Sequence, residues 1–454
     1  MMVAMRRGLL GAAAVAFVGV GLLLILGLAS TCSGAGDGPC MELVAHVRYD
    51  MGGDLQFQRR SGVHTLDGVR VATTTDLVFA SAHTDMSRVD GGIEIFDITD
   101  PSRPTRLTRI PCPGYQSDVA VHETLLLQTL DHQASNAGCD PEWLRTSGSG
   151  DVDRAATAGV RIFDVTDPSR PRLTHFLEVT GEIGDGVHDV TVLPWAGVAY
   201  LAQLNGELGI LDLGDPEFPY TAIEVGSISP EMKTSCHDIG LDPVRLLAFC
   251  PAMQDETYIL DVREPARPTY LGKVVNAALS RHHGALMAPD GVTLVLESEY
   301  DHPPEVASDA AAGLWFYDLT EPTDPELLGS WAPESCEPTE RAERACSSHW
   351  FNFIAGTDLL VAAWRHEGVY VVDYTDPAAA VETGFFSPSS WAGALRPIAT
   401  ADFWTAYFWR GHIYGSSGGS RSGLYILRHN DIADAEPSLY DEGTSWGRWT
   451  AEGP

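Results

Sequence analysis

The sequence predicts an all-β fold, a seven-bladed β-propeller built from four-stranded antiparallel blades. The first observation is a recurring segment, seen most clearly at Gly92–Pro104 (GIEIFDITDPSRP) and Gly159–Pro171 (GVRIFDVTDPSRP). Weaker copies have their marker aspartate at Asp212, Asp261, Asp318 and Asp373. A remnant, Gly423–Leu427, keeps the apolar segment and lacks the Asp-Pro ending. Six copies and a remnant indicate one repeat domain over residues 42–428.

The second observation is that a single unit, residues 188–225, contains four strand patterns in a row. Strands are predicted at Asp189–Val192, Val198–Ala202, Leu208–Leu213 and Thr221–Val225, from alternating or continuous apolar residues. Asn205-Gly206 is a strong hairpin signal between the second and third of them. Because such a sheet is apolar on both faces, it must be covered on both, and radial stacking of blades does this.

The repeated Asp-Thr-Asp-Pro ending is interpreted as a turn. Asp and Thr side chains bond to backbone N–H groups two residues on, and Pro presets the turn. A calcium loop needs more converging oxygens than this segment supplies.

Closure of the ring is predicted from the chain ends. The last unit lacks a fourth strand, and Glu42–Arg48 (ELVAHVR) has the character of the outer strand at Pro171–Leu177. We therefore expect the N-terminal strand to close the last blade on Gly423–Leu427. Residues 429–454 are polar and acidic, and are predicted to form a C-terminal tail.

Residues 1–32 predict a signal peptide or a membrane anchor. Arg6 and Arg7 precede an apolar run from Gly8 to Leu28, and small residues lead to Cys32. Two alternatives stay open: a lipoprotein signal with lipidation of Cys32, or an uncleaved anchor, since about 20 apolar residues span a bilayer. Either one places the folded part outside the cytoplasm, with residues 33–41 as a tether.

Eight cysteines fit an oxidising compartment. Their spacing predicts local disulfides between Cys112 and Cys139, Cys236 and Cys250, and Cys336 and Cys346. Cys32 and Cys40 remain: Cys40 is unpaired if Cys32 is lipidated, and otherwise the two could pair.

The formal net charge of −33 argues against nucleic acid as a partner, because phosphates attract basic surfaces. The expected partners are a protein, peptide or glycan ligand and, through the N-terminal anchor, a membrane. A monomer is expected.

The repeat also resembles a known family. Ile95-Phe96-Asp97, Ile162-Phe163-Asp164 and Val371-Val372-Asp373, each preceded by Gly and an apolar residue and followed by Asp-Pro, are similar to the LVIVD repeat of bacterial surface and exported β-propellers. The resemblance covers residues 42–427. It implies a secreted or lipid-anchored propeller, and it implies no common reaction or ligand.

Histidines recur at one position of the repeat. The residue just before the first strand is His188, His237, His283 and His349 in the third to sixth units, and it is Asp67, Ser117 and Trp404 in the others. Insertions at His83–Gly91, Asp131–Ala158 and Glu299–Ala312 all follow the second strand, so one face is rich in loops. The residues expected to line a pocket on that face are His83, Asp85, His132, His282, Glu297, His302, Trp364 and His366.

Two interpretations of the histidines stay open. Neutral imidazoles bind zinc or copper, and Asp189, Asp238, Glu297 and Glu299 are available to orient them at the channel mouth. Equally, a histidine before the inner strand is a packing device in other propellers. Trp364 could line the pocket or pack between blades.

Two functions follow. The first is an extracytoplasmic, membrane-tethered binding or scaffolding module that uses its loop-rich face. The alternative is a metal-dependent enzyme, of the copper oxidase kind, with a metal on His188, His237, His283 and His349. The sequence contains no Gly-x-Ser-x-Gly, His-Glu-x-x-His or phosphate-loop motif.

Overall fold

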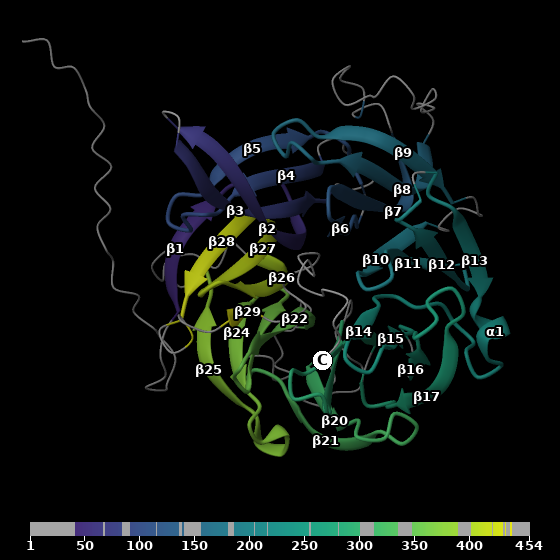
Figure 1. Ribbon diagram of the computed structural model, residues 1–454. Coiled ribbons are helices and arrows are strands. Elements are labelled where there is room, and N and C mark those ends of the chain that lie inside the picture. The colour runs from purple at the N-terminus through teal and green to yellow at the C-terminus, as the bar shows by residue number, and fades with distance from the viewer. Residues whose placement is uncertain are drawn as a thin grey trace, which may run out of the picture. The chain divides into compact units, whose positions relative to one another are not determined.

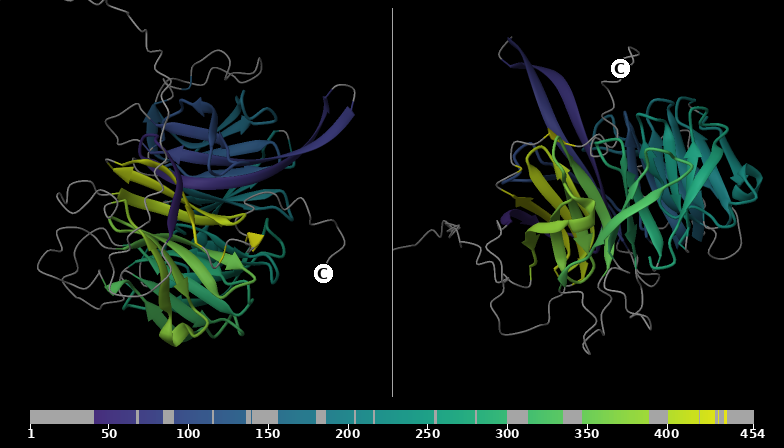
Figure 2. Two further views of the ribbon diagram at one scale, coloured as in Figure 1. Left: turned by 90° about the vertical axis from the view of Figure 1, so that its left-hand side faces the viewer. Right: turned by 90° about the horizontal axis from the view of Figure 1, so that it is seen from below.

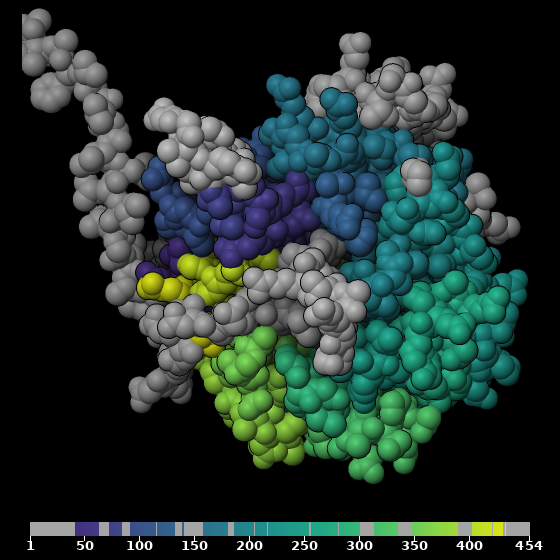
Figure 3. All heavy atoms as spheres, viewed as in Figure 1, coloured from purple at the N-terminus to yellow at the C-terminus, as the bar shows by residue number. Residues whose placement is uncertain are grey.

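The computed structural model describes residues 41–429, 432 and 436–437, with gaps at 67–68, 84–90, 115, 136–138, 140–155, 180–185, 204, 216, 254–255, 280, 300–312, 335–346, 389–400 and 420. All of them belong to one compact unit, Cys32–Pro454. Within these ranges the strands form seven antiparallel sheets arranged around a central axis (Figure 1). The chain is a seven-bladed β-propeller. In the space-filling view the blades follow one another around the ring in chain order (Figure 3).

The strands of the first four blades run outward from the axis in sequence order. Blade 1 is β2 (Gly52–Leu66), β3 (Val69–Ala82), β4 (Gly92–Asp97) and β5 (Thr105–Ile110). Blade 2 is β6 (Val119–His122), β7 (Leu125–Ser135), β8 (Ala156–Asp164) and β9 (Arg172–Glu178). Blade 3 is β10 (Val187–Leu193), β11 (Val198–Gln203), β12 (Glu207–Asp212) and β13 (Tyr220–Glu224), followed by the one-turn helix α1 (Val225–Ile228). Blade 4 is β14 (Gly240–Asp242), β15 (Leu247–Pro251), β16 (Glu256–Asp261) and β17 (Thr269–Val275).

The last three blades repeat this order with two additions. Blade 5 is β18 (His282–Met287), β19 (Thr293–Ser298), β20 (Leu314–Asp318) and β21 (Glu326–Trp331). Blade 6 is β22 (Ser348–Ala355), β23 (Leu359–Trp364), β24 (Gly368–Asp373) and β25 (Val381–Phe386), with the 3-10 turn η4 (Pro377–Ala379) before β25. Blade 7 is β26 (Ala401–Trp409), β27 (His412–Gly419) and β28 (Gly423–Arg428), completed by β1 (Glu42–Val47).

The predicted closure of the ring is confirmed. β1 pairs antiparallel with β28, from Glu42 opposite Arg428 to Val47 opposite Leu424. The two ends of the propeller domain therefore share one blade, and β1 covers the outer edge that β28 would otherwise expose.

The beginning of the predicted acidic tail packs on the propeller. His429 and Ile432 are buried, and Ile432 belongs to the apolar cluster between blades 6 and 7. The two-residue strand β29 (Glu436–Pro437) then pairs with the inner strand β22. The chain after β28 thus adds a fifth strand to blade 6.

The first blade differs from the prediction in one respect. β2 and β3 pair continuously from Gly52 and Ala82 to Leu66 and Val69, while β4 reaches only as far as Leu77 on β3. The two strands extend beyond the other blades as a projecting hairpin (Figure 2). Asp67 lies between them, outside the described residues, so the assignment of Asp67 to the start of the inner strand is wrong. The inner strand of blade 1 begins instead at Gly52.

The repeated aspartates form turns, as predicted. Asp97 Oδ1 accepts a hydrogen bond from the backbone N–H of Thr99 at 2.9 Å, and Asp100 Oδ1 accepts one from Ser102 at 3.1 Å. Asp164 and Asp373 make the same bond two residues on. The repeat segment is therefore a frame for the blades.

The disulfides Cys112–Cys139 and Cys236–Cys250 are confirmed. Cys336 and Cys346 lie outside the described residues, as do Cys32 and Cys40. No helix among the described residues is long and apolar enough to cross a membrane, and the predicted segment from Gly8 to Leu28 lies outside them.

Candidate metal centre

The inner strand of most blades begins with a β-bulge, and the extra residue lies at the repeat position singled out in the sequence. The register shifts between Val187 and Asp189, between His282 and Gly284, and between Ser348 and Trp350. His188, His283 and His349 are the residues skipped. A bulge re-aims a side chain out of the regular alternation. These histidines consequently line the central cavity, whereas Val187 and Ser348, which precede two of them, are completely buried.

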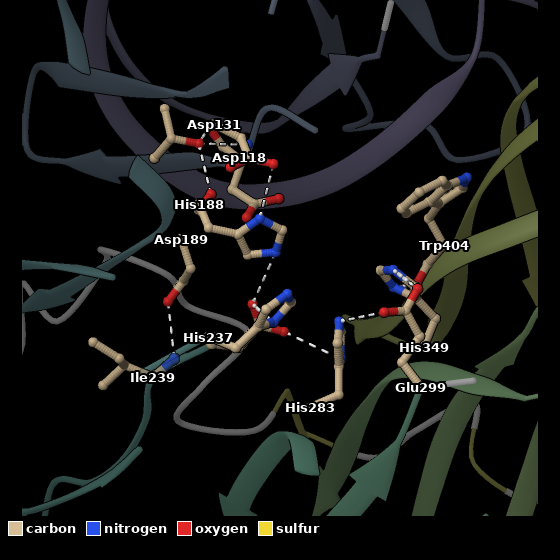
Figure 4. A network of polar contacts seen from close by, with 12 residues as sticks. Asp118, Asp131, His188, Asp189, His237, Ile239, His283, Glu299, His349 and Trp404 are labelled. Carbon is tan, nitrogen blue, oxygen red and sulfur yellow. Dashed lines mark hydrogen bonds and ion pairs between the residues drawn. The ribbon is translucent and has the colours of Figure 1, made fainter. Parts of the chain in front are cut away.

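His188, His237, His283 and His349 form a continuous arc of imidazoles, here called the histidine arc. Their ring centroids are separated in turn by 3.8, 4.5 and 4.7 Å (Figure 4). The four residues come from four consecutive blades and span more than a third of the described chain. Trp404 occupies the same bulge position in blade 7 and stacks edge-on against His349 at 4.5 Å.

An oxygen lies against Nδ1 of each imidazole in the arc. Nδ1 of His349 lies 2.9 Å from the Trp404 carbonyl oxygen, and Nδ1 of His283 hydrogen-bonds to the buried Glu297 carboxylate. Nδ1 of His237 lies 3.2 Å from Asp238 Oδ1, and Nδ1 of His188 lies 3.4 Å from Asp131 Oδ2. A metal bound through Nε2 would leave the ring proton on Nδ1, where it faces this oxygen.

Carboxylates lie beside the Nε2 atoms. His188 Nε2 is 3.7 Å from Asp238 Oδ1, and His283 Nε2 is 3.6 Å from Glu299 Oε2. Two sets of potential ligand atoms result, each lying within 4.8 Å of one another. The first set is His188, His237, Asp238 and His283, and the second is His283, Glu299 and His349.

Burial and charge set the protonation of the arc. Burial lowers the pKa of His237 to about 4 and holds that of His349 well below its ordinary value, so both rings are neutral at pH 7. Burial also disfavours the charged form of His283, but Asp238, Glu297 and Glu299 outweigh it and raise the pKa to about 10. A field that holds a proton this strongly also favours a metal cation.

Further aspartates follow the bulge position in blades 1 to 3. Asp54, Asp118 and Asp189 line the same cavity as the arc. Burial raises the pKa of Asp54 and of Asp189 to about 7. Asp118, Asp189 and Asp238 bring one carboxylate oxygen each within 4.8 Å of the others. The acidic side of the cavity therefore lies next to the first ligand set.

The cavity itself has a volume of about 140 Å³ and is lined from all seven blades. The arc, Trp404 and the aspartates form its polar part. Val190, Val192, Leu241 and Leu286 contribute apolar wall. A ligand could thus contact the arc and an apolar surface together.

The other predicted pocket residues lie in several different places. His83 lines the cavity, but its Nδ1 accepts a hydrogen bond from the Ser117 backbone N–H, so the proton of its neutral ring is on Nε2. His366 is not among the lining residues, and its Nδ1 lies 3.8 Å from Asp402 Oδ1. His282 does not line the cavity: its ring nitrogens contact Thr257 Oγ1 in β16 and the Asn276 carbonyl after β17, both in the neighbouring blade 4.

Trp364 is completely buried and packs edge-on against Trp331 and Tyr370, so it is a packing residue and no part of the cavity lining. Glu297 is equally buried and supports His283 from behind. Asp85 and His302 lie outside the described residues, as does the side chain of His132.

Sequence reasoning missed Asp54 and Asp131. Asp54 was missed because blade 1 was aligned on the wrong strand, and an alignment starting at Gly52 would have put Gly53-Asp54 opposite His188-Asp189. Asp131 lies in β7, the second strand of blade 2, next to His132, and the sequence carries no signal that it faces His188.

Comparison with known proteins supports the fold alone. No protein family and no curated protein matches the sequence. Among solved structures, the chain is similar to the β-propeller domain of Cps50 (Swd1) from Myceliophteria thermophila, with a TM-score of 0.53 and 11% identity over 85% of this chain and 99% of that one. It is also similar to Raptor from Chaetomium thermophilum, with a TM-score of 0.53 and 11% identity over 87% of this chain and 29% of Raptor. Similarity at this identity carries no ligand or activity across.

Proposed function

We propose that this propeller binds a transition metal, copper or zinc, in its central cavity through His188, His237, Asp238 and His283. One observation carries the proposal: Nδ1 of each imidazole in the histidine arc faces an oxygen, which leaves Nε2 for a metal. The contact is a hydrogen bond in His283 and His349, and a separation of 3.4 and 3.2 Å from a carboxylate in His188 and His237. Metal-binding histidines typically donate their other N–H to a carboxylate or a carbonyl, and this contact fixes the tautomer and the ring. A histidine that only packs blades together uses both ring nitrogens for contacts within the protein, as His282 of blade 5 does with blade 4.

The spacing of the first ligand set supports the same conclusion. Nitrogen and oxygen ligands about 2.0–2.2 Å from a tetrahedral metal lie about 3.3–3.6 Å from each other. The potential ligand atoms of this set lie within 4.8 Å of one another. Side-chain movements of about an ångström would therefore bring all of them within bonding distance of one metal ion. Imidazole nitrogen with one carboxylate oxygen suits zinc and copper better than calcium or magnesium.

Charge balance points in the same direction. Asp131, Asp238, Glu297 and Glu299 are all buried around the arc. The cations facing them are the protonated His283 and Arg365, whose Nη1 lies 2.9 Å from Glu299 and whose Nε lies 2.8 Å from Asp402. Four buried carboxylates against these two cations leave a negative cavity, and a bound metal cation offsets the cost of burying that charge.

A metal-dependent enzyme is the second candidate. The observation that favours it is the open cavity beside the arc, because catalytic metals keep a position open to a substrate whereas structural metals are enclosed. The apolar wall at Val192 and Leu286 would contact the apolar part of such a substrate.

The chain is also proposed to be an exported, membrane-tethered propeller of the LVIVD-repeat kind. The N-terminal pattern of Arg6, Arg7 and the following apolar run supports export, and the two disulfides fit an oxidising compartment. Binding of a protein, peptide or glycan by the loop-rich face stays a prediction, because most of the residues of its insertions lie outside the described ones.

The test is a metal count. The full chain, purified in detergent without a histidine tag and equilibrated with Zn²⁺ or Cu²⁺, is expected to retain metal through desalting. The His188→Ala, His237→Ala double variant should lose metal bound at this site, and His282→Asn should keep it, with folding of each followed by circular dichroism. A wild-type chain that retains no metal, or a double variant that retains as much as wild type, would overturn the proposal.

A further inference from the structure

We infer that the cavity holds a second transition-metal ion, bound by His283, Glu299 and His349 and adjacent to the first. This inference rests on the proposed function and extends it from one metal to a two-metal centre. His283 is the one residue common to both ligand sets. His349 and Glu299 are absent from the first set, and His188 and His237 are absent from the second.

The carboxylate of Glu299 lies between the two imidazoles. Its Oε2 is 3.6 Å from His283 Nε2, and its Oε1 is 3.7 Å from His349 Nε2. Both separations exceed a hydrogen bond, which has a donor–acceptor distance of about 2.7–3.2 Å. They are close to the roughly 3.3–3.6 Å between two ligands of one tetrahedral metal. The carboxylate of Glu299 thus lies close to both imidazole nitrogens, and one ligand atom from each of the three residues lies within 4.8 Å of the others.

His349 and Glu299 are each oriented by a second contact within the protein. The His349 ring is fixed by the contact between Nδ1 and the Trp404 carbonyl at 2.9 Å. Glu299 accepts a hydrogen bond from Arg365 at 2.9 Å, and the Arg365 guanidinium lies over the Trp404 ring at 4.3 Å. Fixed supporting contacts of this kind are what orient ligands in metal sites. The ligands need little reorganisation on binding.

His283 lies between the two positions. Its Nδ1 lies 3.3 Å from Asp238, a member of the first set, and its Nε2 faces Glu299 in the second. Nδ1 also bonds to Glu297, so Nε2 is the stronger ligand and belongs to the second metal. The first metal then relies chiefly on His188, His237 and Asp238. Each ion thus has two imidazoles and a carboxylate of its own.

The experiment is a titration of the metal-free full chain with Co²⁺, followed by the visible absorption of bound cobalt, with Zn²⁺ retention counted by elemental analysis. Wild type is expected to show a break at two equivalents. His349→Ala and Glu299→Gln should each reduce the count to one, as should the His188→Ala, His237→Ala double variant. His282→Asn is the matched control and should keep both. Two variants of the second set are used so that a folding defect in either one leaves the other informative.

Two adjacent ions also give a spectroscopic signature. In wild type loaded with two equivalents of Cu²⁺, magnetic coupling should broaden or suppress the electron paramagnetic resonance signal, and His349→Ala should restore the signal of an isolated ion. A wild-type chain that binds one equivalent, with His349→Ala unchanged, would overturn the second metal and leave the proposed function standing. A chain that binds no metal would overturn both.

Discussion

Substitution of Glu297 by glutamine tests whether the carboxylate that contacts His283 Nδ1 raises the affinity of the site for a metal. Glu297 is 0% exposed, accepts the His283 Nδ1–H bond, and accepts a second bond from Ser348 Oγ at 3.0 Å. Glutamine keeps this shape: its carbonyl oxygen can accept from His283, and its amide can donate to Ser348 Oγ. The substitution therefore removes the negative charge while the packing remains.

The expected magnitude follows from burial. Loss of a supporting contact to a metal ligand typically lowers metal affinity about 10- to 100-fold. Because Glu297 is completely buried, water does not screen its charge, and we expect the upper part of that range, about 30- to 100-fold, or roughly 2–2.7 kcal/mol. The assay is competition for Zn²⁺ with a chromogenic chelator at pH 7.

Glu94→Gln is the matched control. Glu94 is also buried, but it lies in β4 of blade 1, where its carboxylate is 2.9 Å from Arg106 Nε. This variant should lose stability and keep its Zn²⁺ affinity. An unchanged affinity in Glu297→Gln, or an equal loss in Glu94→Gln, would refute the reasoning that Glu297 acts through His283.

Three further predictions concern stability, measured by urea unfolding of the metal-free chain. Cys236→Ser with Cys250→Ser opens a link between residues 14 apart, and should lower the free energy of unfolding by about 3 kcal/mol through the entropy of the unfolded chain. Trp364→Ala should cost about 3–5 kcal/mol, because it empties a fully buried site against Trp331, and it should leave the metal count unchanged. The raised pKa of Asp54, about 7, means that the folded state holds a proton that the unfolded state has released above about pH 4. Its contribution to stability should therefore fall as pH rises from 4 to 7, by at most about 1.4 kcal/mol per pH unit, and Asp54→Asn should flatten that slope.

Each of these has a result that would contradict it. For the cysteine variant, a free energy of unfolding equal to that of the oxidised wild type would show that this disulfide does not stabilise the fold. A change in metal count on Trp364→Ala would show that the tryptophan reaches the cavity. A pH slope that is the same in Asp54→Asn as in wild type would place the titrating proton elsewhere.

The sequence by itself determined the frame of this protein. Copies of Gly-apolar-Asp-Pro fixed the number of blades, period-2 alternation fixed the strands, and local cysteine spacing fixed Cys112–Cys139 and Cys236–Cys250. These features depend on neighbours in the chain or on repetition, both of which can be read from one sequence. The match between Glu42–Arg48 and other outer strands even identified the strand that closes the ring.

Only the tertiary structure decided what the histidines do. His282 and His283 are adjacent and identical in type, yet one is bonded to the neighbouring blade 4 and the other lines the central cavity. A β-bulge separates them, and bulges depend on pairing with a strand that the local pattern does not specify. The grouping of His349 with Glu299, and of His188 with Asp238, likewise depends on how neighbouring blades are placed around the axis. Those contacts are long-range, so the sequence could predict a histidine at the start of four blades but not which ligands share a metal.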